Sequence, residues 1–180
     1  MLDTKWFYDE DTGRYVVKNA RMLFPNFQGA EQDYNQPGKR NFRLQLTEDL
    51  AEEMRNRGVH VRMREGRDET EDDQYLMKVG VYQDADIRLL SGKAKTRVIL
   101  DNDDRGMPTK DDQGKLIDSE FKKGHIKNGE IGIEFHVSKN TRVATSSPYV
   151  RVDTMIIPIR KSRLLEDYED YEDDDDPFDD

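Results

Sequence analysis

The sequence predicts a mainly β protein: a small five-stranded barrel with one helix, long polar loops and a disordered acidic tail at the C-terminal end. Two observations favour this fold class. Strand-like segments are separated by turn residues at short intervals, and only one stretch has the pattern of a helix. In addition, 34% of the 180 residues are hydrophobic and 38% are charged, so the core must be thin and much of the chain must lie at the surface.

The strands are predicted from apolar alternation and from apolar content. The clearest is 39–46, where Phe42, Leu44 and Leu46 are expected to face the core and the polar residues between them to face out. Residues 75–82 carry apolar side chains on both faces, which is typical of a central strand. The other strands are expected at about 14–24, 59–63, 96–100, 130–138 and 149–159.

The one predicted helix spans residues 48–57. Thr47 is a suitable N-cap and Gly58 a suitable stop, and acidic residues in the first turn favour the positive end of the helix dipole. Leu50 and Met54 lie four residues apart and therefore on one face. We expect these two side chains to close one end of the barrel.

A strand with a basic outer face is expected directly after the helix. Val59, Val61 and Met63 are predicted to face inward, and Arg62 and Arg64 to face out. The cluster of acidic residues between 65 and 73 is expected to form a loop. Basic and acidic residues are thus segregated along this part of the chain.

The charge distribution divides the chain into two parts. The net charge is −10, yet residues 166–180 hold 11 of the 39 acidic residues and no Lys or Arg, which leaves 28 acidic against 29 basic residues in 1–165. We therefore expect a nearly neutral folded domain over 1–165 and a disordered acidic tail over 166–180. A nearly neutral domain can still present a basic groove for phosphates.

Several functional classes find no support in the sequence. The absence of cysteine excludes disulfides, thiolate zinc sites and cysteine nucleophiles. The three histidines are isolated and no nucleotide-binding or hydrolase motif occurs, so we expect neither an enzyme nor a cofactor. Residues 101–112 have the length of a calcium loop, but Arg105 occupies a ligand position and no helices flank the segment, so no metal is expected.

The sequence also predicts a soluble intracellular protein. No apolar run approaches the roughly 20 residues that cross a bilayer. The first ten residues lack the basic and then apolar layout of a signal peptide. No membrane partner is therefore expected.

Basic and aromatic residues interleave in the body, as single-stranded nucleic-acid binding requires: cations follow the phosphate backbone while bases stack on rings. The residues expected to bind DNA are Tyr34, Lys39, Arg40, Arg43, Arg62, Lys78, Tyr82, Arg88, Lys93 and Lys95. A further aromatic platform is formed by residues 6–8. For each ring the alternative is burial in the core, and for the lysines at 93 and 95 it is a solvated strand edge.

The tail combines a dense acidic run with aromatic residues, which a purely solubilising segment does not need. Carboxylates can imitate phosphates and rings can imitate bases in a basic groove, or Phe178 can insert into a partner protein. The alternative is a solvated tail without a partner. The residues expected to bind a partner are Asp173, Asp174, Asp175, Asp176, Pro177 and Phe178.

The order of these features resembles the single-stranded DNA-binding proteins of tailed bacteriophages. The matching stretches are residues 17–21, 38–46 before the helix, 98–101 and 129–131, together with the acidic tail. The tail is also similar to that of bacterial single-strand binding proteins, where several Asp precede a terminal apolar-Pro-Phe. Here Asp179 and Asp180 follow Phe178, and Asp176 occupies the apolar position.

The resemblance implies an OB-fold body that binds single-stranded DNA without sequence preference in the cytoplasm of the infected bacterium. It further implies roles in phage DNA replication, recombination and repair, recruitment of replication proteins such as a DNA polymerase or helicase through the tail, and a homodimer. Two other classes remain open. An acidic DNA mimic would inhibit a host nuclease or DNA-binding protein, and a phage head-decoration protein would also account for the barrel.

Overall fold

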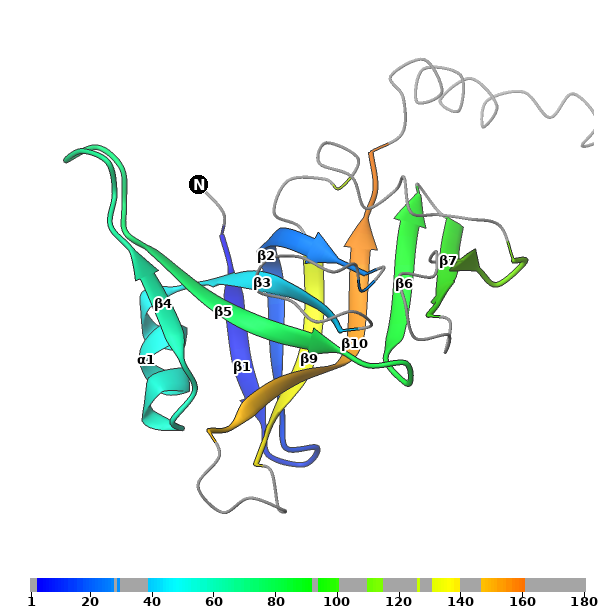
Figure 1. Ribbon diagram of the computed structural model, residues 1–180, viewed down its shortest axis with the longest axis horizontal. Helices are drawn as coiled ribbons and strands as arrows, with labels where there is room; N and C mark the ends of the chain where they lie inside the picture. Colours follow the sequence, from blue (N-terminus) through cyan, green and yellow to red (C-terminus); the bar gives the residue numbers. More distant parts are fainter. Residues whose placement is uncertain are drawn as a thin grey trace, which may run out of the picture.

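The computed structural model describes residues 3–27, 29, 39–91, 94–100, 110–114, 126, 131–139 and 147–160. Within these residues the chain forms ten strands and one helix (Figure 1). The elements are β1 (Lys5–Asp9), β2 (Arg14–Asn26), β3 (Arg40–Leu46), α1 (Glu48–Asn56), β4 (Val61–Arg64), β5 (Gln74–Val81), β6 (Asp86–Ser91), β7 (Ala94–Ile99), β8 (Lys110–Asp111), β9 (Ile131–Ser138) and β10 (Tyr149–Pro158).

Five of these strands form a closed ring. Antiparallel pairs join β5 to β3, β3 to β2, β2 to β9 and β9 to β10. Parallel pairing of Arg151 with Gly80 then joins β10 back to β5. β4 continues the sheet beyond β5, β1 pairs with β2, and β6 and β7 extend from β10. The predicted mainly β class with one helix is confirmed. A five-stranded barrel was predicted, and the structure has a closed ring of five strands.

The 13-residue strand β2 bends twice, so that it serves two sides of the ring. Its first half pairs with β9 and its second half with β3. The pairing shifts register between Val17 and Ala20, and again between Leu23 and Asn26. Such bulges bend a strand and increase its twist. Each bulge contains one non-glycine residue with a positive φ.

The core follows the predicted alternation along the ring strands. Phe42, Leu44 and Leu46 on β3 are buried, as are Met77, Val79 and Val81 on β5 and Ile131, Ile133 and Phe135 on β9. Leu76 on the other face of β5 is also buried, and β5 pairs with β3, β4 and β10. The prediction that this segment is a central strand is therefore confirmed.

Met63 lies on the same face of β4 as Val61, as predicted, but it is not buried in the core. Val61 is buried and pairs with Met77, whereas Met63 pairs with Tyr75 nearer the tip of the β4–β5 hairpin and is exposed. The hairpin extends well beyond the ring (Figure 1). No core remains for Met63 to join at that height, although the alternation along the strand continues.

α1 packs an apolar face against the core. Leu50, Ala51 and Met54 are buried, and the helix ends one residue earlier than predicted. The Tyr15 hydroxyl donates a hydrogen bond of 2.7 Å to Oε1 of the half-buried Glu53. This bond, with a second one from Arg57, lowers the pKa of the Glu53 carboxyl. The carboxylate thereby ties α1 to β2.

We predict that Leu50→Ala lowers the free energy of unfolding by about 2–5 kcal/mol, because the Leu50 side chain is fully buried and its truncation leaves a cavity. Urea denaturation measures the change. Glu52→Ala on the exposed side of the same helix is the control and should change stability by less than about 0.5 kcal/mol. Equal losses in the two variants would contradict the packing described.

Candidate nucleic-acid interface

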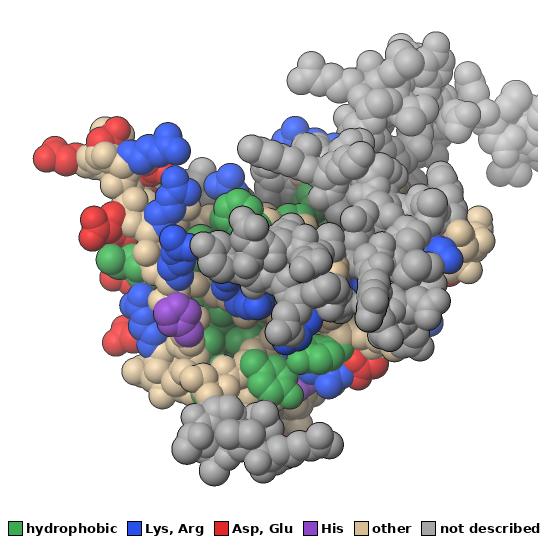
Figure 2. Space-filling model, viewed as in Figure 1, with side chains coloured by type: hydrophobic (Ala, Val, Ile, Leu, Met, Phe, Trp, Pro, Cys, Tyr) green, Lys and Arg blue, Asp and Glu red, His purple; other side chains and the backbone are tan. Residues whose placement is uncertain are grey.

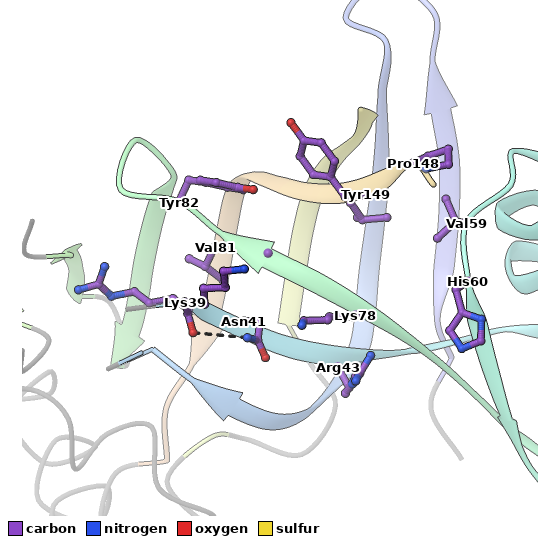
Figure 3. Close-up of a pocket in the computed structure, with 13 residues that line it drawn as sticks. Lys39, Asn41, Arg43, Val59, His60, Lys78, Val81, Tyr82, Pro148 and Tyr149 are labelled. Carbon is purple, nitrogen blue, oxygen red and sulfur yellow. Dashed lines mark hydrogen bonds between the residues drawn. The ribbon is translucent and has the colours of Figure 1, made fainter. Parts of the chain in front are cut away.

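A groove of about 600 Å³ lies on the outer face of the ring, where β3, β5 and the start of β10 meet. It runs over the face of β3 and β5 opposite the core, because successive side chains on a strand point to opposite faces. Figure 3 shows the side chains that surround it. The lining residues are Lys39, Arg40, Asn41, Arg43, Val59, His60, Lys78, Gly80, Val81, Tyr82, Pro148, Tyr149 and Val150.

Cations are concentrated on this face. Arg43 and Lys78 are direct partners across the β3–β5 ladder. Burial, together with the nearby charges of Arg43 and Lys39, lowers the pKa of Lys78. Burial and the charge of Arg62 lower the pKa of Arg43 in the same way. We call Lys39, Arg43, Arg62 and Lys78 the basic strip.

The basic strip is unfavourable for the isolated fold. Like charges directly opposite in an antiparallel pair, here Arg43 and Lys78, destabilise a sheet, and desolvation adds a cost to these two charges. Both costs are relieved when an anion lies over the strip. A row of phosphates is the ligand type that this arrangement favours.

Basic and acidic side chains occupy different parts of this face of the molecule. Figure 2 shows Lys and Arg side chains along the β4–β5 hairpin and across the face beside it, next to a cluster of hydrophobic side chains. Acidic side chains lie at the tip and outer margin of the hairpin, and others lie beyond the hydrophobic cluster. The acidic segment 65–73 connects β4 to β5 at this tip. It is therefore held at the end of the hairpin while the strands themselves carry the cations.

Two exposed rings form one rim of the groove (Figure 3). The side chains of Tyr82 and Tyr149 are 45% and 41% exposed, and their ring centroids lie 6.4 Å apart with the planes tilted by 51°. The Arg151 guanidinium carbon lies 4.7 Å from the Tyr82 ring centroid, and Arg151 forms an ion pair with Asp84. The cation–π contact fixes the Tyr82 ring at the rim.

The structure brings together five of the residues that the sequence predicted to bind DNA: Lys39, Arg40, Arg43, Lys78 and Tyr82 all line the groove. Arg40 also anchors the chain, since its Nε donates a hydrogen bond of 2.7 Å to the Phe27 carbonyl oxygen. Arg62 lies on β4 and influences the groove through Arg43.

Two further predicted residues that the structure describes do not line the groove. Arg88 and Lys95 lie on β6 and β7 and are not among its lining residues. Arg88 forms an ion pair of 2.8 Å with Asp86. Tyr34, Lys93 and all the predicted partner-binding residues of the tail, 173–178, lie outside the described residues.

Sequence reasoning missed Tyr149, the second ring of the rim. The signal for it was present: Tyr149 directly follows Pro148 and begins a strand, so it sits at a loop boundary where a ring is easily left exposed. Gly80 was also missed. Gly80 pairs with both Asn41 and Arg151. A Cβ built on Gly80 would lie 3.4 Å from Cε2 of the Tyr82 ring.

The aromatic platform predicted at residues 6–8 lies on β1 and does not line the groove. The Trp6 indole Nε1 donates a hydrogen bond of 2.9 Å to Asp49. The Arg57 guanidinium carbon lies 4.9 Å from the Tyr8 ring centroid. These two rings therefore help to hold α1, and only Phe7 projects freely, with 52% of its surface exposed.

The described part of the chain has neither a candidate metal site nor a helix that could span a membrane. It contains no group of three or more His, Asp or Glu side chains placed to hold a metal ion. Of the calcium-like segment, residues 101–109 lie outside the described residues. No helix in the described ranges is long and apolar enough to span a membrane.

Comparison with known proteins gives two similarities. The profile of a family described as "Putative phage ssDNA-binding domain" matches residues 10–111. Among solved structures, the chain is similar to a C-terminally truncated single-stranded DNA-binding protein from bacteriophage Enc34, with 10% sequence identity and a TM-score of 0.43 over 84% of this chain and 88% of that one. No curated protein shows significant similarity to the chain.

We predict that Lys78→Thr raises the free energy of unfolding by up to about 1 kcal/mol, because it removes the like-charge pair with Arg43 and keeps a residue suited to a strand. Urea denaturation at low salt measures the change, and added salt should reduce it. Lys78→Arg keeps the charge and is the control. A loss of more than about 1 kcal/mol in Lys78→Thr would show that Lys78 stabilises the fold instead.

Proposed function

The chain belongs to the phage single-stranded DNA-binding domain family, and we propose that it binds single-stranded DNA without sequence preference in the groove between β3, β5 and β10. The observation that carries the proposal is the position of the Arg43–Lys78 pair beside the Tyr82–Tyr149 rim. Cations for phosphates and exposed rings for bases are the two components of single-strand binding. Here they line one groove.

The geometry favours single strands over duplex. Stacking on Tyr82 needs a base whose face is accessible, and a duplex buries base faces within its own stack. In OB-folds the second and third strands of the barrel form the nucleic-acid-binding face, and β3 and β5 are the second and third strands of the ring in chain order. None of the thirteen lining residues is acidic, which disfavours a DNA mimic.

In the proposed function, the acidic tail regulates DNA binding. Residues 166–180 carry 11 acidic residues, so without them the net charge changes from −10 to about +1. The tail competes with DNA for the basic strip and recruits replication proteins such as a polymerase or helicase. In the cytoplasm of the infected bacterium the protein then acts in phage DNA replication, recombination and repair, as a homodimer. The charge separation along the chain supports this division of roles.

The proposal is tested by fluorescence anisotropy with single-stranded oligo(dT), a mixed-sequence single strand and a duplex of equal length. Both single strands should bind with similar affinity and more tightly than the duplex, and affinity should fall steeply as salt rises, because bound counterions are released. Equal affinity for single strand and duplex would contradict the proposal. A flat salt response would point to a ligand other than nucleic acid.

In the same assay Tyr82→Ala should weaken binding by about 1–3 kcal/mol, the cost of losing one stacked base. Tyr82→Trp keeps an aromatic face and should bind like the wild type. The ring is 45% exposed, so neither variant should lose much stability on thermal melting. A loss of about 3–5 kcal/mol in the stability of Tyr82→Ala would instead mark a core ring.

For the tail we predict that deletion of residues 166–180 tightens single-stranded DNA binding at low salt, because repulsion of the phosphate backbone and competition for the groove are both removed. Phe178→Ala leaves the charge unchanged and separates the two causes. If the tail docks through its ring, this variant also binds DNA more tightly and loses its replication partners in a pull-down. Unchanged DNA affinity after deletion would contradict autoinhibition.

A further inference from the structure

Phe24 on β2 combines two features that a folded chain normally avoids. Its φ is +51°, in the left-handed region that is an outlier for a bulky residue. Its side chain is 71% exposed, the most exposed large hydrophobic residue in the described part of the chain. In addition, Pro25 follows, and a proline restricts the preceding residue to extended conformations. The backbone at Phe24 is therefore strained, and no burial compensates for the strain.

The local sequence would place this ring inside the protein if β2 were regular. Met22 pairs with Leu44. In a regular antiparallel pair, position 24 would then lie opposite the buried Phe42, two residues before Leu44 on the same face of β3. The bulge sets Phe24 and Pro25 opposite Phe42, since Leu23 pairs with Arg43 and Asn26 with Asn41. A bulge re-aims side chains, and here it turns an aromatic ring out of the core.

The strained conformation is held from both sides. Before the bulge, Leu23 is fixed by its pairing with Arg43. After it, the Phe27 ring is buried and stacks on Phe42 at 6.1 Å between centroids, and the Phe27 carbonyl accepts the hydrogen bond from Arg40. Backbone strain persists only where the surrounding structure imposes it, and such residues cluster at functional sites.

The other bulge of β2 has a polar residue, not an aromatic one, at its positive φ. Asn19 also has a positive φ, of 54°, but asparagine tolerates this conformation far better than phenylalanine. The Asn19 carbonyl accepts a hydrogen bond of 2.8 Å from the Thr4 hydroxyl. The bend of β2 thus needs a positive φ, and a polar residue supplies it. The ring at position 24 is not needed for bending.

The position of Phe24 relates it to the groove. The two residues that flank the bulge pair with Arg43 and Asn41, both of which line the groove. β3 separates β2 from β5, so Phe24 lies on the far side of β3 from Tyr82 and beyond the residues that line the groove. We propose that Phe24 is a second base-stacking platform, so that a single strand lies over the basic strip with bases stacked on rings at both sides. This inference rests on the proposed function.

The test compares Phe24→Gly, Phe24→Leu and Phe7→Ala with the wild type in oligo(dT) anisotropy and thermal melting. Glycine adopts a positive φ without cost, so Phe24→Gly should melt at or above the wild-type temperature and still bind about 5- to 150-fold more weakly, the range for one lost stacked base. Phe24→Leu keeps the apolar character without the ring and should also weaken binding. Phe7, equally aromatic and exposed on β1, is the control, and Phe7→Ala should bind like the wild type.

A second measurement reports contact directly. Phe24→Trp should retain affinity and show quenching of tryptophan fluorescence by oligo(dT) beyond that of the wild type, whose one tryptophan is Trp6. Wild-type affinity in Phe24→Gly, alongside weakened binding in Tyr82→Ala, would overturn the second platform and leave the proposed function intact. Absence of oligo(dT) binding by the wild-type protein would overturn both.

Discussion

The closing contact of the ring, between β5 and β10, is the constraint on which the candidate site depends. It consists of one parallel pair, Arg151 with Gly80. A Cβ at position 80 would lie in van der Waals contact with the Tyr82 ring, at 3.4 Å, and with the Val150 carbonyl oxygen, at 3.5 Å, so β5, the ring and β10 pack closely at this point. Because β10 meets β5 at this point, Tyr149 and Arg151 come to lie beside Tyr82. Without the contact, the basic strip would have no aromatic rim.

The same two strands carry the core on one face and the groove on the other. On the inner face of β3 and β5, Phe42, Met77 and Val79 are fully buried. On the outer face, Arg43 opposes Lys78 at a cost to the sheet. Local arrangements that weaken a fold are expected where function requires them, with the stability supplied elsewhere. Here the buried inner face supplies that stability. In the proposed function, the rings exposed on the outer face stack on bases while the Arg43–Lys78 pair binds phosphates.

The sequence was informative where alternation was strict. The pattern along residues 39–46 and 75–82 predicted both strands, the second of them as a central strand, and with them the side of each strand that bears Lys39, Arg43, Lys78 and Tyr82. Alternation did not predict the exposure of Met63, because it indicates which face of a strand a residue occupies and not how far the core extends. The short strands β1 and β6 were not predicted, since their charged residues obscure the period. Phe24 escaped notice because a bulge reverses its direction, and Tyr149 because it begins its strand.

Photo-cross-linking tests the central claim, that one groove holds the bases, most directly. Full-length protein is irradiated with oligo(dT) carrying 5-iodouracil, and the cross-linked residues are identified by mass spectrometry. The account predicts cross-links at Tyr82 and Tyr149, which disappear when unlabelled single-stranded DNA is added in excess. Cross-links confined to Phe7 on β1, or to β6 and β7, would place the DNA on another face of the ring and contradict the account.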